Sequence, residues 1–230
     1  MCTRYTVRDL EAAVRAIAQE LGIDLGEIRG AAARYNLAPS QVASTVALAG
    51  GRASVRSMRW GFIPPADRAM PKPRLLTNAR AETMTELPAF RAAVAARRCV
   101  VPADGFYEFK VVGQGRDPYL FTRRDGAPLA FAGLWEPADG EVSGTFCILT
   151  TEPNATTRPI HNRMPVLLTG AAVGQWLGEE PLSDGRRQEL IRPAPDDLLT
   201  LRPVNRYVNN SRHEGPECVA DPDPALPELF

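Results

Sequence analysis

Short apolar segments separated by turn residues restrict this chain to folds built mainly from antiparallel strands. The clearest example is PYLFTRRDGAPLAFAGLWE, residues 118–136, in which two apolar runs flank Asp125 and Gly126. An Asp-Gly pair between two such runs is a strong short-range signal for a β-hairpin. Further apolar runs at 99–112 and 144–154 predict more strands, the first with a turn in its middle. We therefore expect a hairpin-rich antiparallel sheet at the centre of the fold.

A few segments show the spacing of amphipathic helices instead. Between Asp9 and Gly22 the apolar side chains recur every three or four residues, and these two residues are a favourable N-cap and C-cap. A second helix is expected from about Pro88 and a short third one at 171–178, whereas YNLAPSQ, residues 35–41, reads as a loop. Many strands with a few peripheral helices predict an α+β fold around a curved antiparallel sheet or barrel.

No linker or internal repeat divides the chain, so residues 2–213 are predicted to form one domain. Residues 214–230 form an acidic, proline-rich tail that need not be ordered. The whole chain has 27 basic and 27 acidic residues, and five of the acids lie in the tail, which leaves 27 against 22 in the domain. Only two of the basic residues are lysines, and arginine suits bidentate contacts to phosphate. Codon usage explains most of that bias, so a DNA-binding hypothesis has to name particular arginines.

The cysteines and histidines argue against a metal site. The four cysteines form no CxxC pair, and the chain has only two histidines, so we predict neither zinc nor any other cofactor. Cys99 and Cys147 lie in apolar runs and are expected to be small buried hydrophobic residues. Charged residues close behind Met1 leave no apolar signal segment, and no apolar run approaches the roughly 18 residues that span a bilayer. We expect a cytoplasmic monomer that does not bind membranes.

Four stretches place polar groups where packing does not require them. If residues 106–109 form a strand, Glu108 shares a face with Phe106 and has aromatic neighbours on both sides, which desolvates its carboxyl and raises its pKa. Each group also has an ordinary explanation: a solvent-facing strand glutamate, a satisfied loop histidine, a turn asparagine or a cysteine without a role. The candidates, in chain order, are Cys2 with Arg4, Asn78 to Glu82 in NARAE, Glu108 in GFYEF, and His161 with Arg163 in PIHNRMP.

Seven motifs that occur in order resemble one known family. They are MCTRY, RYNLAPSQ, WGFIP, NARAET, RRCVVPADGFYEF, AGLWE and IHNRMPVLL. Together they resemble the SOS response-associated peptidase (SRAP) family, whose members are also called abasic-site processing proteins, and the resemblance runs from residue 2 to about residue 210. It implies a single SRAP domain that binds single-stranded DNA containing abasic sites and crosslinks covalently to them through an N-terminal cysteine.

The resemblance also implies which residues carry the chemistry. Matched motif by motif, the family's catalytic residues fall on Cys2, Asn78, Glu108 and His161. Its DNA-contacting arginines fall on Arg4, Arg80 and Arg163, and positions that line the DNA path fall on Pro39 and Thr150. Two departures stand out, because Thr3 replaces a common glycine and the loop PPADRAM lacks the tryptophan pair of some relatives.

A cysteine at the N-terminus suits this chemistry because it carries an α-amine and a thiol on neighbouring carbons. The amine, with a pKa of about 8, condenses with the aldehyde of a ring-opened abasic site, and the thiol then closes a thiazolidine ring. Met1 has to be lost first, either by the protein's own action or by a methionine aminopeptidase. Glu108 is expected to move protons, His161 to act as an acid and Asn78 to hold the amine or a sugar oxygen.

Two other classes of function remain open on the sequence alone. An N-terminal-nucleophile amidohydrolase or peptidase would also need a free N-terminal cysteine and a general base, but not the arginines around the site. A non-catalytic single-stranded DNA-binding module would use the arginines and would not depend on Cys2.

Overall fold

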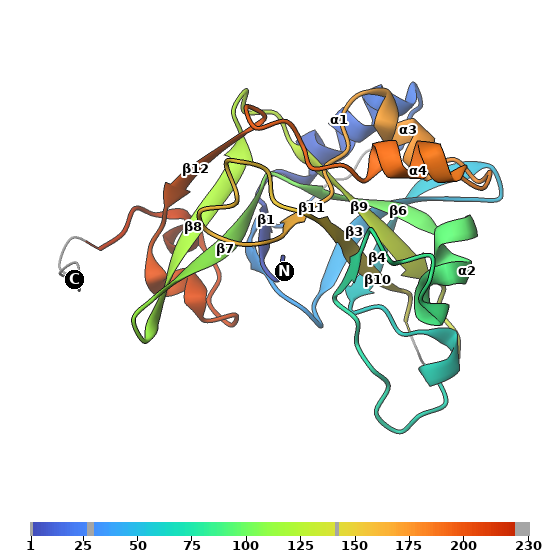
Figure 1. Ribbon diagram of the computed structural model, residues 1–230, viewed down its shortest axis with the longest axis horizontal. Coiled ribbons are helices and arrows are strands. Elements are labelled where there is room, and N and C mark those ends of the chain that lie inside the picture. Colours follow the sequence, from blue (N-terminus) through green and yellow to red (C-terminus); the bar gives the residue numbers. More distant parts are fainter. Residues whose placement is uncertain (1, 27–29, 141–142, 224–230) are drawn as a thin grey trace.

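The fold consists of two β-sheets with helices packed around them (Figure 1). This computed structural model describes residues 2–26, 30–140 and 143–223. The first sheet has five strands in the order β12-β8-β7-β1-β2. Their bounds are β1 Tyr5–Val7, β2 Arg34–Leu37, β7 Gly105–Val112, β8 Gly115–Arg123 and β12 Leu199–Pro203.

The second sheet closes on itself, as a barrel does. Its order is β11-β10-β4-β3-β6-β9, and β10 also pairs with β9, so five of its strands form a ring. The short strand β5 adds to β10 in parallel. The bounds are β3 Val42–Ala49, β4 Arg52–Trp60, β5 Asn78–Arg80, β6 Arg98–Ala103, β9 Leu129–Glu136, β10 Thr145–Thr151 and β11 Met164–Pro165. The predicted α+β fold with a barrel-like antiparallel core is therefore confirmed.

One glycine lets the ring of strands close. Gly133 of β9 lies opposite Cys99 of β6 on one side and Ile148 of β10 on the other. A Cβ atom at this position would lie 2.8 Å from the carbonyl oxygen of Cys147 and 2.9 Å from the Sγ of Cys99. Both approaches are too close for a side chain, which explains the glycine in the AGLWE motif.

The helices cover the outside of the barrel. Figure 1 shows α1, α3 and α4 together on one side of the molecule and α2 beside β6 and β9. Asp9 caps α1 as predicted, because its carboxylate accepts a 2.8 Å hydrogen bond from the backbone N–H of Ala12, and Gly22 ends the helix in the left-handed conformation. The bounds are α1 Leu10–Leu21, α2 Pro88–Ala96, α3 Ala171–Leu177 and α4 Asp184–Leu190, with 3-10 turns at Pro65–Asp67, Arg206–Asn209 and Pro216–Val219.

The hairpin predicted for residues 118–136 is wrong. β8 pairs with β7 and β12, whereas β9 pairs with β6 and β10, so the Asp125–Gly126 turn carries the chain from one sheet to the other. β9 is buried along nearly its whole length and therefore needs partners on both sides, which the closed barrel provides. The tight hairpins join β3 to β4 and β7 to β8 instead.

Other departures from the expected elements are local. Residues 35–41, expected as a loop, contribute most of β2, and β3 and α4 were not predicted. The apolar run 99–112 forms two strands in different sheets, joined at Asp104. The part of the tail that the structure describes, up to Asp223, packs on the five-stranded sheet and buries Cys218 completely, whereas residues 224–230 lie outside the described part.

Aromatic side chains fill the space between the two sheets. Tyr5 of β1 makes edge contacts with Trp60 and Phe131 of the barrel at ring-centroid distances of 5.3 and 5.8 Å. Phe106 of β7 stacks on Phe121 at 4.9 Å. Cys2 belongs to this buried cluster, so the core that joins the sheets also fixes the start of the chain. Among the described residues, no helix is long and apolar enough to cross a membrane.

Candidate functional site

Strand β1 carries Cys2 into the space between the two sheets. Tyr5 pairs with Phe106 of β7, and the backbone N–H of Tyr107 donates to the carbonyl of Arg4 at 3.0 Å, so the chain before Tyr5 runs along β7 towards Glu108. Cys2 is completely buried. Burial and the nearby Glu108 carboxylate raise the pKa of the Cys2 thiol well above its usual range. The sulfur is therefore a neutral thiol at physiological pH, and any reaction at it needs a base.

The carboxyl of Glu108 can serve as that base. As its position in the aromatic stretch predicts, Phe106 packs in the core between the sheets and Tyr107 packs on the opposite face of β7. Glu108 is only 2% exposed, and desolvation raises the pKa of its carboxyl from 4.5 to about 7. A carboxyl with this pKa can both take and give a proton near neutral pH.

His161 faces Glu108 from the loop between β10 and β11. Its Nδ1 lies 3.9 Å from Oε2 of Glu108. The same nitrogen lies 3.0 Å from the backbone nitrogen of Arg163 and 3.1 Å from its carbonyl oxygen, so it can accept from the first when neutral or donate to the second when protonated. Burial, aided by the charge of Arg163, lowers the pKa of His161, so the ring is mostly neutral at pH 7.

Asn78 holds the backbone of Cys2, whose thiol lies close enough to Glu108 to feel its charge. It is the first residue of β5 and pairs with Ile148 of β10. Its Nδ2 donates to the carbonyl of Cys2 at 2.9 Å and to Oγ1 of Thr77 at 3.2 Å. Its Oδ1 is buried and accepts no hydrogen bond from the described residues. The side chain thus holds the backbone of Cys2 and keeps one acceptor available beside it.

The four residues that the sequence identified as catalytic candidates therefore lie in one site. They come from four separate segments: the start of β1, β5, β7 and the loop before β11. A hydrogen bond links Cys2 to Asn78, and the 3.9 Å approach links Glu108 to His161. The described residues contain no group of three or more ligands that could hold a metal ion.

The raised pKa of Glu108 predicts a specific pH dependence of stability. Because the folded protein binds this proton more tightly than the unfolded chain, the stabilisation is complete below about pH 4.5 and is lost as the pH rises through about 7. Glu108→Gln cannot ionise. At pH 8.5 its free energy of unfolding in urea should exceed that of the wild type by about 3 kcal/mol, and the difference should vanish near pH 4.

A matched control for that measurement is Glu86→Gln. Glu86 is exposed, so Glu86→Gln removes one carboxylate from the surface and leaves the buried carboxyl of Glu108 unchanged. The Glu86 variant should follow the wild type at every pH. A stability difference for Glu108→Gln that does not change with pH would show that the substitution alters packing and not ionisation.

Of the predicted DNA-contacting arginines, Arg4 lies in an internal network. Its Nη1 donates to Oδ1 of Asn36 at 3.1 Å and to the carbonyl of Val208 at 2.9 Å, and its Nη2 lies 3.4 Å from the carbonyl of Asn209. The guanidinium also lies over the ring of Phe109, 6.0 Å from its centroid. All these acceptors are uncharged, so Arg4 keeps its positive charge within two residues of Cys2.

Arg163 and Arg80 differ in their surroundings. Arg163 forms a bidentate ion pair with the carboxylate of Glu82, at 2.9 and 2.8 Å, and also donates to the carbonyl of Thr150 at 2.5 Å. Arg80 is exposed, and its side chain has no hydrogen bond or ion pair with another described residue. Thr150 is buried on β10, and Pro39 is half-buried in the turn after β2.

The sequence analysis missed Asn36, which contacts Arg4, and included Glu82 only as the last residue of the stretch NARAE. Asn36 of β2 is completely buried, and its Nδ2 donates to the carbonyls of Asn210 and His213 at 3.0 and 2.9 Å. The carboxylate of Glu214 accepts from the backbone N–H of Tyr35, the residue before Asn36. Glu82 forms the ion pair with Arg163. Asn36 and Glu82 lie inside motifs, RYNLAPSQ and NARAET, but only their distant partners reveal what they do.

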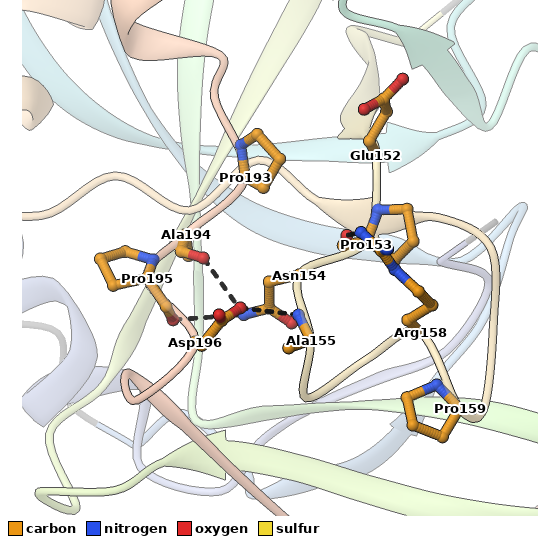
Figure 2. Close-up of a pocket in the computed structure, with 10 residues that line it drawn as sticks. All are labelled: Glu152, Pro153, Asn154, Ala155, Arg158, Pro159, Pro193, Ala194, Pro195 and Asp196. Atoms are coloured by element: carbon orange, nitrogen blue, oxygen red, sulfur yellow. Dashed lines mark hydrogen bonds between the residues drawn. The ribbon is translucent and has the colours of Figure 1, made fainter.

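A cavity of about 710 Å³ adjoins the loop that carries His161, but none of the predicted site residues lines it. Figure 2 shows Asn154 between its two walls, residues 152–159 and 193–196. The Nδ2 of Asn154 donates to the carbonyls of Ala194 and Pro195, both at 3.2 Å, and the backbone N–H of Ala155 donates to Asp196 at 2.6 Å. These bonds anchor the base of the His161 loop.

Two solved structures share this fold. A protein from Bacteroides thetaiotaomicron superposes with a TM-score of 0.76 over 96% of this chain and 99% of its own, at 24% identity. A protein from Bordetella bronchiseptica gives a TM-score of 0.71 over 89% of this chain and 100% of its own, at 28% identity. The arrangement of the two sheets is therefore not particular to this chain.

Similarity in sequence identifies the family. YoqW of Bacillus subtilis, named an abasic site processing protein, is 35% identical over 189 residues, 80% of this chain and 84% of YoqW. YoaM of the same organism, with the same description, is 35% identical over 227 residues, 95% and 97% of the two chains. HMCES of Xenopus tropicalis, also so described, is 36% identical over 71% of this chain and 56% of its own. Since the family model of the SOS response associated peptidase (SRAP) matches residues 1–211, the chain belongs to the SRAP family.

Proposed function

We propose that this protein processes abasic sites in single-stranded DNA by forming a thiazolidine between the ring-opened sugar and Cys2, after loss of Met1. The observation that carries the proposal is the hydrogen bond from Asn78 to the carbonyl of Cys2. It lies in a largely buried site that also contains Glu108 and His161. The names of the relatives, abasic site processing proteins, support the same reading. Met1 itself lies outside the described residues.

The proposed reaction needs no oxidant or cofactor. The α-amine of Cys2 adds to the C1 aldehyde, and the adduct loses water to give an imine. The thiol then adds across the carbon–nitrogen double bond, so that a carbon–sulfur bond forms and the thiol proton ends on the nitrogen. Water is the only product released. Because the thiol attacks a carbon already tethered to its own residue, ring closure has the advantage of an intramolecular step.

Glu108 and His161 are suited to the proton transfers of this sequence. Burial raises the pKa of Glu108 to about 7 and lowers that of His161, and Nδ1 of His161 lies 3.9 Å from Oε2 of Glu108. Glu108 would take the proton of the Cys2 thiol and return it to the nitrogen. His161 would protonate the sugar ring oxygen or the departing water. The buried Oδ1 of Asn78 would accept from the α-amine once Met1 is gone.

We propose that Arg4, Arg80 and Arg163 hold the DNA backbone and that Pro39 and Thr150 line its path. Arg4 keeps an uncompensated charge beside Cys2, and Arg80 is exposed on β5, two residues from Asn78. Charges so placed would attract the phosphates that flank the lesion. We further propose that the protein acts as a cytoplasmic monomer.

Arg80 offers the cleanest test of DNA binding, because replacing it breaks no internal bond between described side chains. Arg80→Ala should weaken binding to any single-stranded oligonucleotide by a similar factor and reduce the salt slope of log K by about 0.7. Fluorescence anisotropy over a salt series measures both. Arg52→Ala, which replaces another exposed arginine at the β3–β4 turn, is the control that should change neither. Equal slopes for the two variants would remove Arg80 from the interface.

Intact mass spectrometry tests the proposed function directly. The mature protein mixed with an abasic oligonucleotide should give one species with the summed mass of the two less one water, and the strand should stay whole. Binding without this species would indicate a non-catalytic DNA-binding module. Turnover of a small amide by the same protein, without the species, would indicate an N-terminal-nucleophile amidohydrolase. Detection of full-length chain that loses Met1 on incubation alone would assign that cleavage to the protein itself.

A further inference from the structure

The carboxylate of Glu82 pairs with the edge of the Arg163 guanidinium formed by Nη1 and Nη2. Oε1 and Oε2 of Glu82 accept from Nη1 and Nη2 at 2.9 and 2.8 Å, the parallel geometry with which arginine also binds a phosphate. The Arg163 side chain is 14% exposed and that of Glu82 is 39% exposed. The pair therefore lies at the surface, where a DNA phosphate can reach it but finds the guanidinium already engaged.

Charge distinguishes Arg163 from the other two arginines proposed to bind DNA. Among the described residues, Arg4 donates only to uncharged acceptors and Arg80 has no ion pair. Burial would raise the pKa of Glu82, but hydrogen bonds from Arg163 and its charge outweigh burial and leave that pKa lowered. Glu82 is thus a full negative charge at neutral pH, and it cancels the charge of Arg163 alone.

We propose that Glu82 is a specificity-determining residue that competes with DNA phosphate for Arg163 and so weakens the hold of the protein on undamaged DNA. This inference rests on the proposed function. An undamaged strand offers only reversible contacts, so it must displace Glu82 with no covalent bond to follow. An abasic strand needs to stay bound only until Cys2 reacts, after which dissociation no longer matters. The competition therefore penalises the wrong substrate more than the right one.

The fold can keep its shape without this charge. Glu82 also accepts from Oγ1 of Thr151 at 3.4 Å, and Arg163 is additionally held by the carbonyl of Thr150. Glutamine at position 82 keeps one oxygen for these donors and is isosteric with glutamate. Glu82→Gln should therefore leave the His161 loop in place, a point that equal melting temperatures would establish.

The expected result is tighter binding of undamaged DNA. Glu82→Gln should lower the Kd for an undamaged single-stranded oligonucleotide by about threefold to tenfold, since exposed ion pairs and single charges at this distance are worth factors of that order. The preference for crosslinking an abasic strand in the presence of excess undamaged competitor should fall by a similar factor. Glu86→Gln, the same charge change at an exposed site without an ion pair to Arg163, is the matched control and should shift the Kd far less.

A double-mutant cycle separates competition from a general charge effect. In an Arg163→Ala background the gain from Glu82→Gln should disappear, because there is no guanidinium left to release. An equal gain in both backgrounds, or an equal gain for Glu86→Gln, would overturn the inference, as would weaker binding by a Glu82→Gln protein that folds normally. The wild type in the same assay reports on the proposed function: if it neither binds nor crosslinks DNA, that proposal fails as well, whereas normal wild-type activity confines the failure to Glu82.

Discussion

Cys2→Ser protein is expected to give no heat-stable adduct with an abasic oligonucleotide. The serine variant keeps the α-amine, so an imine can form, but a hydroxyl closes the ring far less favourably than a thiol. The adduct should therefore appear only after a hydride reductant is added to trap the imine. Denaturing gels after heating, with and without the reductant, measure the difference, which should approach complete loss of the stable product.

Two further proteins make that experiment decisive. A chain that retains Met1 has the thiol of Cys2 but no free α-amine on it, so it should form neither the imine nor the ring. Cys147→Ala removes a different buried thiol, in β10 of the barrel, and should crosslink like the wild type. A full yield of heat-stable adduct from Cys2→Ser, or from protein that retains Met1, would refute the aminothiol mechanism.

Glu108→Gln is expected to slow both formation and reversal of the crosslink by about tenfold to a hundredfold. Gln keeps the shape of the side chain but cannot exchange a proton, and the Cys2 thiol then has no base beside it. In the wild type the rate should depend on a group with a pKa of about 7, and in Glu108→Gln this dependence should be lost. His161→Ala should slow formation mainly, because opening of the sugar ring precedes any attack on it.

Adduct yield against time measures formation, and transfer to an aldehyde-reactive trap measures reversal. Both should be followed across pH 6–8. Circular dichroism and the affinity for undamaged DNA are the controls for folding. Neither should change for Glu108→Gln or His161→Ala. If both variants match the wild type in both phases at every pH, Glu108 is an ordinary strand glutamate and His161 an ordinary loop histidine, without a part in the chemistry.

Local signals in the sequence predicted local features well. The alternation around Glu108 predicted that Phe106 and Tyr107 face opposite ways and that the carboxyl is desolvated, because these properties depend on strand geometry and on adjacent residues. Asp9 and Gly22 marked the ends of α1 for the same reason. The barrel and the α+β class followed from the number of short apolar segments.

Pairing between distant segments was not readable in the same way. The Asp125–Gly126 turn has a strong hairpin signal, yet which strands pair depends on closing the barrel, and a local signal carries no information about that. The partners of Arg163 and Arg4 are 81 and 204 residues away in the chain. Resemblance to a family assigned the four site residues to one site before the structure was known. It did not reveal that the carboxylate of Glu82 neutralises the charge of Arg163.

The contacts of Arg4 and Asn36 have a consequence for how the protein is made. Arg4, next to β1, donates to the carbonyl of Val208, and Asn36 of the neighbouring strand β2 donates to that of His213, although both carbonyls leave the ribosome more than 170 residues later. A nascent chain therefore exposes its N-terminus early but cannot fix Cys2 in position until residues 208–213 have left the ribosome and folded back onto β1 and β2. A chain that stops before residue 208 would therefore carry the proposed nucleophile without the contacts that position it.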